Sequence, residues 1–387
     1  MSEPAAEPRI PLARPLLGER EEELVLEVLR SGMLSLGPML GRFEDAFEQR
    51  LGATGAVAVS SGTTALHLGV RSLGWGDGDQ ILTSPLSFVA SSNCLLYEGA
   101  TPRFCDVDPA TLCIDPEIAE AAINDEVTGI LPIHIFGYPA AMERLESLSS
   151  RHGLGLLEDA AQALGAICAD GVQVGARGNP TAFAFYANKQ MTTGEGGMLM
   201  LADPEAIAVA RSERNQGRAP EMKVMNHERI GFNYRLTDIA AALGIAQLER
   251  LDELFASRQA IAGAYTERFA DLGGAEPGAG DANDLLLPLA NQGRAKRSWF
   301  VYLLRLPKAA DRDAVIDALE QDGIDARAYI PCIHLQPPYR ERFGFRGGEF
   351  PVAEDFSRRG LALPFYPGLG EAAIERVVSS LRRALGR

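Results

Sequence analysis

A single lysine, Lys189, lies in the stretch FYANKQMTTGEGG (185–197), between an aromatic run that predicts a strand and a turn rich in glycine and threonine. A lysine amine that is partly desolvated near a positive ring has a lowered pKa and can form a Schiff base with an aldehyde. A solvated lysine in a surface loop is the alternative. The polar residues elsewhere in the chain indicate which of these two interpretations is correct.

A second stretch, VSSGTTALHL (59–68), predicts a strand that turns directly into a helix. Gly62 allows the backbone to approach a ligand closely, and Thr63 is one of the hydroxyl residues where the chain turns into the helix. Free N–H groups and hydroxyls at a helix start are suited to a phosphate. A helix cap rich in serine and threonine that binds no ligand has the same pattern.

A third stretch, LLEDAAQALGA (156–166), places Asp159 where a strand ends. Asp159 can cap the following helix, or it can keep a pyridine nitrogen protonated through their mutual attraction. Gln162 can form a hydrogen bond with a ring hydroxyl. A phosphate cradle, a carboxylate and a lysine, in this order, together indicate a site for pyridoxal phosphate.

The elements that carry these groups alternate along the chain. Strands are predicted at 56–59, 80–83, 101–107, 128–133 and 153–159, helices at 64–74, 88–99, 116–124 and 140–153, and a packing helix at 39–51 from the spacing of Leu40, Phe43, Phe47 and Leu51. This alternation predicts an α/β fold with a mainly parallel central sheet and helices on both faces. Ligands bind such sheets beyond the carboxyl ends of the strands.

Three parts of the chain are expected. A long helical segment, 236–269, precedes a stretch rich in glycine and alanine, and an α+β pattern follows it. We therefore expect an N-terminal arm (1–15), a large α/β domain that binds pyridoxal phosphate (16–255) and a smaller C-terminal α+β domain (256–387).

Composition excludes several classes of function. The net charge of −15 over 387 residues opposes binding to nucleic acid or to an anionic membrane. No apolar run reaches the roughly 18 residues of a membrane span, and the N-terminus lacks the apolar segment of a signal peptide. Five scattered cysteines and five dispersed histidines favour neither disulfides nor a metal site, so a cytoplasmic protein without a metal is expected.

Eight stretches resemble one family, in family order and from about residue 10 to the C-terminus. They are SGMLSLGPMLGRFE, SSGTTALHL, SPLSFVASSNCLLYEGATPRFCDVD, IHIFGYPA, EDAAQALGA, FYANKQMTTGEGGM, GFNYRLTDIAAALGIAQLERLD and LALPFYPGL. The chain resembles the DegT/DnrJ/EryC1/StrS family of sugar aminotransferases that use pyridoxal phosphate, which have the aspartate aminotransferase fold (fold type I).

The resemblance implies a role for each residue at a matching position. Lys189 would form the Schiff base with the cofactor and later move the proton. Asp159 would pair with the pyridine nitrogen, and Gln162 would reach the ring oxygen. The remaining contacts implied with the cofactor are those of Gly62 and Thr63 with the phosphate, and of Phe88 with the face of the ring.

The resemblance also implies a homodimer with shared active sites. Asn233 would reach the phosphate bound by the partner subunit, while Tyr234 and Arg235 would line the substrate entrance from that neighbour. One position departs from the family: many members have a serine five residues before the lysine, where this chain has Ala184. One hydroxyl contact to the phosphate is therefore expected to be missing.

Three further residues are candidates for binding substrate. His134 follows a predicted strand, and it either faces the site or is a hydrogen-bonded core histidine. Tyr329 and His334 lie in or near the proline-rich segment YIPCIHLQPPYR, where contact with a nucleotide or sugar and ordinary packing are both open.

The predicted function is transfer of an amino group from L-glutamate to a keto group of a nucleotide-linked deoxysugar, a 4-keto-6-deoxyhexose. A 3-keto sugar or a keto-cyclitol is the alternative acceptor. A regulatory protein that binds pyridoxal phosphate without turnover is the alternative from another class. Because Lys189, Asp159 and Gln162 are all present, catalysis is favoured.

Overall fold

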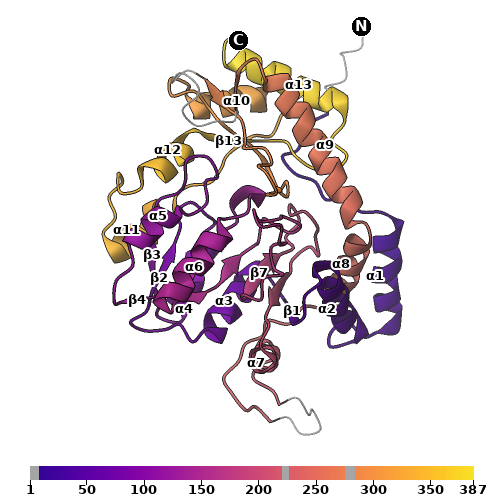
Figure 1. The fold of residues 1–387 in the computed structure, drawn as a ribbon. Coiled ribbons are helices and arrows are strands. Elements are labelled where there is room, and N and C mark those ends of the chain that lie inside the picture. Colours follow the sequence, from indigo (N-terminus) through magenta and orange to yellow (C-terminus); the bar gives the residue numbers. More distant parts are fainter. Residues whose placement is uncertain (1–7, 220–225, 275–283) are drawn as a thin grey trace.

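The computed structural model describes residues 8–219, 226–274 and 284–387, and it contains a large α/β domain and a smaller C-terminal unit (Figure 1). The strands of the large domain are β1 (Ala56–Val59), β2 (Gln80–Thr83), β3 (Thr101–Phe104), β4 (Val127–Leu131), β5 (Gly155–Leu156), β6 (Glu158–Asp159), β7 (Thr181–Ala184) and β8 (Gly197–Met200). Its helices are α1 (Glu19–Ser31), α2 (Pro38–Leu51), α3 (Gly62–Ser72), α4 (Ala90–Tyr97), α5 (Pro116–Ala121), α6 (Met142–His152), α7 (Pro204–Arg214) and α8 (Asp238–Glu249), with a 3-10 turn, η1 (Ile135–Gly137).

The central sheet has two halves, which meet where β5 is followed by β6. The strand orders are β3-β2-β4-β5 and β1-β8-β7-β6. The predicted strand 153–159 is divided into β5 and β6, which belong to different halves. Asp159 N donates to Pro132 O at 2.9 Å, which continues the pairing across the division. Only β8 runs antiparallel to its neighbours in this sheet, so the predicted mainly parallel sheet is confirmed.

Helix α2 packs on the strand that leads to Lys189. Its predicted core positions Phe43 and Phe47 are fully buried. The Phe43 ring lies 5.6 Å from that of Phe185, and the Phe47 ring lies 5.3 Å from that of Phe183, both edge to face. Because side chains alternate along a strand, this packing directs Ala184 and the residue after Phe185 to the opposite face.

The segment 236–269 is two helices and not the one predicted. Helix α8 ends at Glu249 and α9 (Leu251–Phe269) begins at Leu251, because Arg250 leaves the helical conformation at φ −115° and ψ 16°. The Arg250 side chain contacts Glu253 and Glu21 instead. The break lets α8 pack on α1 and α2 while α9 continues into the C-terminal unit (Figure 1).

The C-terminal unit has a second hydrophobic core around its own sheet. Besides α9, its elements are β9 (Gly273–Gly274), β10 (Leu285–Leu286), β11 (Tyr302–Arg305), α10 (Arg312–Gln321), β12 (Arg327–Ala328), η2 (Ile333–Leu335), α11 (Pro337–Phe343), α12 (Pro351–Arg359), β13 (Gly360–Leu363) and α13 (Glu371–Ala384). The strand order is β12-β13-β11-β10-β9. Within the described ranges, no helix combines the length and the apolar content needed to cross a membrane.

The N-terminal segment packs against the C-terminal unit. Residues 1–7 of the expected arm lie outside the described residues. Ile10 pairs with Ile324 and is buried in the C-terminal core. The boundary expected after Phe255 falls inside α9. The segment that contains η2 and α11 returns to the large domain, where Ile333 packs on Phe104.

Asp106 joins the two units through the start of α12. Its carboxylate is buried and accepts hydrogen bonds from Val352 N and Ala353 N, each at 2.9 Å. These N–H groups belong to the first turn of α12 and have no acceptor within that helix.

We predict that Asp106→Ala lowers the free energy of unfolding by about 2–3 kcal/mol, because the substitution leaves buried N–H groups without their charged acceptor. Urea unfolding followed by circular dichroism measures this loss. Asp252→Ala is the matched control, because Asp252 is exposed and forms a surface ion pair with Arg50, and it should cost less than about 1 kcal/mol. Equal costs for the two variants would contradict the tethering role of Asp106.

Candidate active site

One cavity, of about 460 Å³, collects most of the residues predicted to bind the cofactor. It lies where β6 and β7 end and α3 begins. Its volume is in the range of small-molecule sites. The predicted residues that line it are Gly62, Thr63, Phe88, Asp159, Gln162, Lys189 and Tyr329.

Lys189 is held through its main chain, and its amine lies over an aromatic ring. Lys189 N donates to Tyr186 O at 2.9 Å, and Lys189 O accepts from Arg258 Nη2 at 2.9 Å. The Nζ atom lies 4.3 Å from the centroid of the Phe300 ring. Burial lowers the pKa of Lys189 to about 8, and the negative charge of Asp159 opposes part of that shift. A larger share of the amine is therefore neutral and nucleophilic near neutral pH.

Asp159 presents a buried carboxylate at the end of β6. Its Oδ2 accepts from Ser91 Oγ at 2.7 Å, and its Oδ1 accepts from Ala161 N at 3.0 Å. Only 4% of the residue is exposed. A buried carboxylate with two oriented donors is suited to pair with a cationic group inside the cavity.

The amide of Gln162 is oriented by the main chain. Its Oε1 accepts from Phe136 N at 2.8 Å. Because a backbone N–H can only donate, the amide oxygen faces Phe136 and the NH₂ group remains for another acceptor. Among the described residues no acceptor for that NH₂ group is found, and Gln162 lines the cavity. Gln162 is therefore prepared to donate to a ligand oxygen.

The start of α3 forms the anion-binding end of the cavity. The first N–H groups of a helix have no acceptor inside it. Ser61 caps α3 by accepting from Thr64 N at 3.1 Å, which leaves the N–H groups before Thr64 for another acceptor. A Cβ on Gly62 would lie 2.5 Å from the Cβ of Ala184. Glycine is thus required where these two backbones meet, and Ala184 contributes no hydroxyl at this end.

Two aromatic side chains and one amide complete the cavity. Phe88 and Tyr186 both line it, and they are 60% and 50% exposed. The Oδ1 atom of Asn188 is buried without a hydrogen-bond donor among the described residues. Exposed ring faces and an unpaired polar atom in one cavity indicate a polar ligand with a flat ring.

Both histidines considered as substrate contacts are buried away from the cavity. His134 has no exposed surface, its Nε2 lies 3.0 Å from Glu158 Oε2, and its Nδ1 accepts from Ala140 N. His334 also has no exposed surface, and its Nε2 lies 3.2 Å from Glu354 Oε1. Burial lowers the pKa of His334. The structure therefore places both histidines in the core, which for His134 is the second of the two interpretations above.

The three residues assigned to the partner's site do not line the cavity of their own chain. Asn233 is exposed. Tyr234 Oη lies 3.0 Å from His67 Nδ1, and Arg235 Nη1 donates to Asn215 Oδ1 at 3.1 Å. Asn233 pairs with Asn215, and Arg235 pairs with Val59 at the end of β1.

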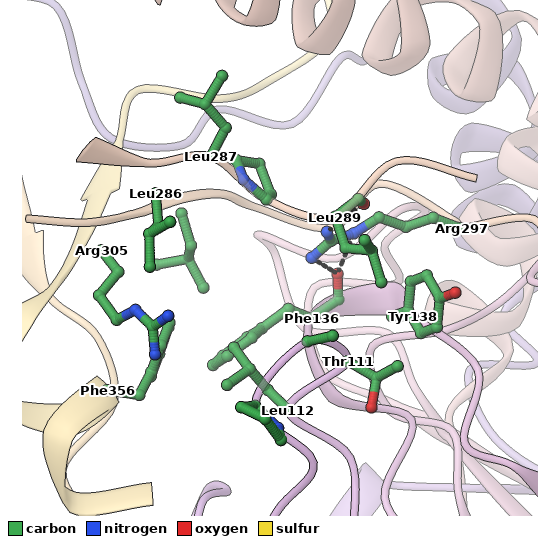
Figure 2. Close-up of a pocket in the computed structure, with 14 residues that line it drawn as sticks. Thr111, Leu112, Phe136, Tyr138, Leu286, Leu287, Leu289, Arg297, Arg305 and Phe356 are labelled. Atoms are coloured by element: carbon green, nitrogen blue, oxygen red, sulfur yellow. Dashed lines mark hydrogen bonds between the residues drawn. The ribbon is translucent and has the colours of Figure 1, made fainter. Parts of the chain in front are cut away.

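A second cavity, of about 40 Å³, lies between the two units (Figure 2). Its lining includes Phe136 and Tyr138 of the large domain and Leu289 of the C-terminal unit. Arg297 crosses the junction and donates from Nε and Nη2 to Phe136 O at 3.2 and 3.0 Å. This cavity has room for a few water molecules only. Arg297 therefore links the two units at this point, and the small cavity is not a candidate site for a substrate or cofactor.

A cluster of His334, Glu349 and Glu354 brings possible metal ligands within 4.8 Å of one another. The Glu354 carboxylate already accepts from Gly348 N and Phe350 N, and Glu349 accepts from two N–H groups of the same turn. These hydrogen bonds fold the turn before α12 and leave the carboxylates satisfied without an ion.

Sequence reasoning missed several residues that shape the site. Ser91 orients Asp159, while Arg258 and Phe300 contact Lys189 from α9 and from the chain before β11. Tyr186 and Asn188 are immediate neighbours of Lys189, and the alternation of side chains along β7 could have indicated Tyr186. The other contacts join segments far apart in the chain, and no local sequence pattern predicts them.

Comparison with known proteins gives a consistent result. The model of the DegT/DnrJ/EryC1/StrS aminotransferase family matches residues 15–382. GDP-perosamine synthase of Caulobacter vibrioides is 37% identical over 382 residues, which cover 98% of this chain and 99% of that protein. The spore coat polysaccharide biosynthesis protein SpsC of Bacillus subtilis is 34% identical, with 96% of each chain covered.

Among solved structures, DesV of S. venezuelae, in complex with a ketimine intermediate, superimposes with a TM-score of 0.88. It is 32% identical, and the match covers 98% of this chain and 99% of that one. The predicted fold type I architecture is therefore confirmed. The chain belongs to the DegT/DnrJ/EryC1/StrS aminotransferase family and is a sugar aminotransferase.

Proposed function

We propose that this chain transfers an amino group from L-glutamate to the keto group of a nucleotide-linked deoxysugar, with pyridoxal phosphate as cofactor. The observation that carries the proposal is the convergence of Lys189, Asp159 and Gln162 in one cavity. Similarity to GDP-perosamine synthase supports a nucleotide-linked sugar as the acceptor. A 4-keto-6-deoxyhexose is the acceptor that we propose.

The residues of the cavity fit pyridoxal phosphate. The first turn of α3, kept open by Gly62, would hold the phosphate, and the Asp159 carboxylate would bind the protonated ring nitrogen. The NH₂ group of Gln162 would donate to the ring oxygen, and Phe88 would cover one face of the ring. The unpaired Asn188 Oδ1 offers a further acceptor.

Bound pyridoxal phosphate supplies an aldehyde that reacts with amines and a ring that withdraws electrons from the attached carbon. Lys189 would supply the amine that holds the cofactor, and its Nζ would afterwards accept and return the proton of the substrate carbon. A pKa of about 8 suits both tasks, because the neutral and the charged amine are each populated near neutral pH. Phe88 and Tyr329 would help to exclude water.

Exposed apolar side chains support the proposal of a homodimer. Six large ones gather between residues 17 and 36: Leu17, Leu26, Leu29, Met33, Leu34 and Leu36. Ile230, three residues before Asn233, is 82% exposed. Such surfaces are typical of protein–protein interfaces. We propose that a second copy covers them and that Asn233 of one copy completes the cavity of the other.

Activity with a panel of acceptors tests the proposed reaction. We expect L-glutamate to yield 2-oxoglutarate with nucleotide-linked 4-keto-6-deoxyhexoses, and little product with 3-keto sugars or keto-cyclitols. Lys189→Ala should reduce turnover at least about a thousandfold, because the amine that binds the cofactor and moves the proton is lost. The exposed Lys308 gives the control, Lys308→Ala, which should keep full activity.

Preference for another acceptor class would replace the proposed sugar while retaining amino transfer. Binding of pyridoxal phosphate without turnover on any acceptor would instead favour the regulatory alternative.

Ala184→Ser tests the departure at the phosphate end. Ala184 lines the cavity, so a hydroxyl there gains a charge-assisted hydrogen bond to the phosphate. We expect the dissociation constant of pyridoxal phosphate, measured by fluorescence titration, to fall by roughly tenfold. An unchanged constant would mean that the phosphate does not lie beside Ala184.

Hybrid dimers test the shared site. Lys189→Ala and Asn233→Ala subunits should each be impaired alone, yet a mixed dimer contains one site with both native residues. After subunit exchange, verified by native mass spectrometry, an equal mixture should recover about a quarter of the wild-type activity. If verified mixed dimers recover none, Asn233 does not act across the interface.

A further inference from the structure

The amine of Lys189 rests against an aromatic ring that does not line the cavity. Phe300 precedes β11 and is only 1% exposed, and the Lys189 Nζ lies 4.3 Å from its ring centroid. The face of an aromatic ring attracts an ammonium group, and the attraction is larger where water is excluded. The contact therefore favours the protonated form of the amine.

A single guanidinium holds both members of this contact. Arg258 of α9 is 3% exposed. Its Nη2 donates to Lys189 O at 2.9 Å, and its Nη1 donates to Phe300 O at 3.0 Å. The main chains that carry the amine and the ring are thus fixed relative to each other by one planar group.

Arg258 has an unusual environment for a buried cation. No carboxylate forms an ion pair with it in the described part of the chain, and its Cζ lies 5.6 Å from the centroid of the Phe365 ring. Burial lowers the pKa of Arg258 to about 10. Its charge is stabilised by two peptide carbonyls and a ring, so its interactions are directed at the segments of Lys189 and Phe300.

We propose that the Phe300 ring face is the resting position of the Lys189 ammonium whenever the amine is not bonded to a carbonyl carbon, and that Arg258 is a positioning residue that sets this distance. The inference rests on the proposed function in one respect, that Lys189 is the reactive amine. We further infer that the C-terminal unit, through Phe300 and α9, determines the position of that amine between reactions.

The ring acts together with the charges around the cavity. The titratable groups that line the cavity with Lys189 are Asp159, Glu195, Tyr186 and Tyr329. Asp159 favours the charged amine, whereas burial favours the neutral one. The ring adds to the effect of Asp159 without adding a further negative charge to the cavity, which would compete with an anionic substrate.

The protonation of Lys189 can be measured directly in the full chain without added cofactor. The chain has four lysines, so competitive acetylation over a range of pH, read by peptide mass spectrometry, reports each amine separately. Acetylation requires the neutral amine, so the labelling of Lys189 should rise with pH around a midpoint near 8. The exposed Lys308 serves as the internal reference.

Phe300→Leu keeps an apolar side chain and removes the ring. The charged amine then loses its attraction, and we expect the Lys189 midpoint to fall by roughly half a unit to one unit. Phe300→Tyr retains the ring face and should retain the midpoint. An unchanged midpoint in Phe300→Leu, or an equal fall in both variants, would overturn the assignment of Phe300.

Arg258→Lys keeps the positive charge but cannot hold two carbonyls with one planar fork. We expect it to lower the Lys189 midpoint as Phe300→Leu does, and the double variant should fall no further than Phe300→Leu alone. Additive falls of the midpoint in the double variant, or no fall in Arg258→Lys, would show that Arg258 stabilises the fold without positioning the Lys189 amine.

The labelling experiment involves neither pyridoxal phosphate nor glutamate. Absence of amino transfer with these labelling results would reject the proposed reaction and leave the resting position intact. The reverse result, normal turnover with an unshifted midpoint in Phe300→Leu, would reject only the resting position.

Discussion

The site depends on one buried negative charge, the carboxylate of Asp159. A carboxylate that is 4% exposed is stable only where donors replace its water, and Ser91 Oγ and Ala161 N supply them. The division between β5 and β6 places this carboxylate at the centre of the sheet, where the two halves meet. Lys189 follows the neighbouring strand, β7, so its amine is desolvated near a fixed negative charge. The cavity thus holds a buried carboxylate and a partly desolvated amine before any ligand binds, as the proposed cofactor would require.

Contacts between the two units extend this arrangement beyond the large domain. Asp106 holds the start of α12, and Arg258 of α9 reaches the main chain of Lys189. Tyr329 brings a side chain of the C-terminal unit to the cavity itself. The break at Arg250 makes these contacts geometrically possible, because α8 can stay packed on α1 and α2 while α9 turns toward the second core. The position of the Lys189 amine therefore depends on contacts from both units.

Much of this could be predicted because the informative patterns are local. A strand that runs into a helix start or a carboxylate, as at Gly62 and Asp159, fixes where its side chains emerge on an α/β sheet. Tertiary contacts leave no such trace: Arg258 is 69 residues from Lys189 and 42 from Phe300. Nor does the sequence show the break at Arg250, because alanine, leucine and arginine favour a helix throughout 236–269. A histidine after a strand, such as His134, has the same pattern whether it faces a ligand or the core.

The central claim is that pyridoxal phosphate is held in this cavity by the amine of Lys189. It is tested most directly by adding pyridoxal phosphate to the purified chain, reducing with borohydride and locating the added pyridoxyl mass by peptide mass spectrometry. With four lysines in the chain, the account predicts stoichiometric modification of Lys189 and none of the others. Modification at another lysine, or at none while the protein remains folded, would contradict it.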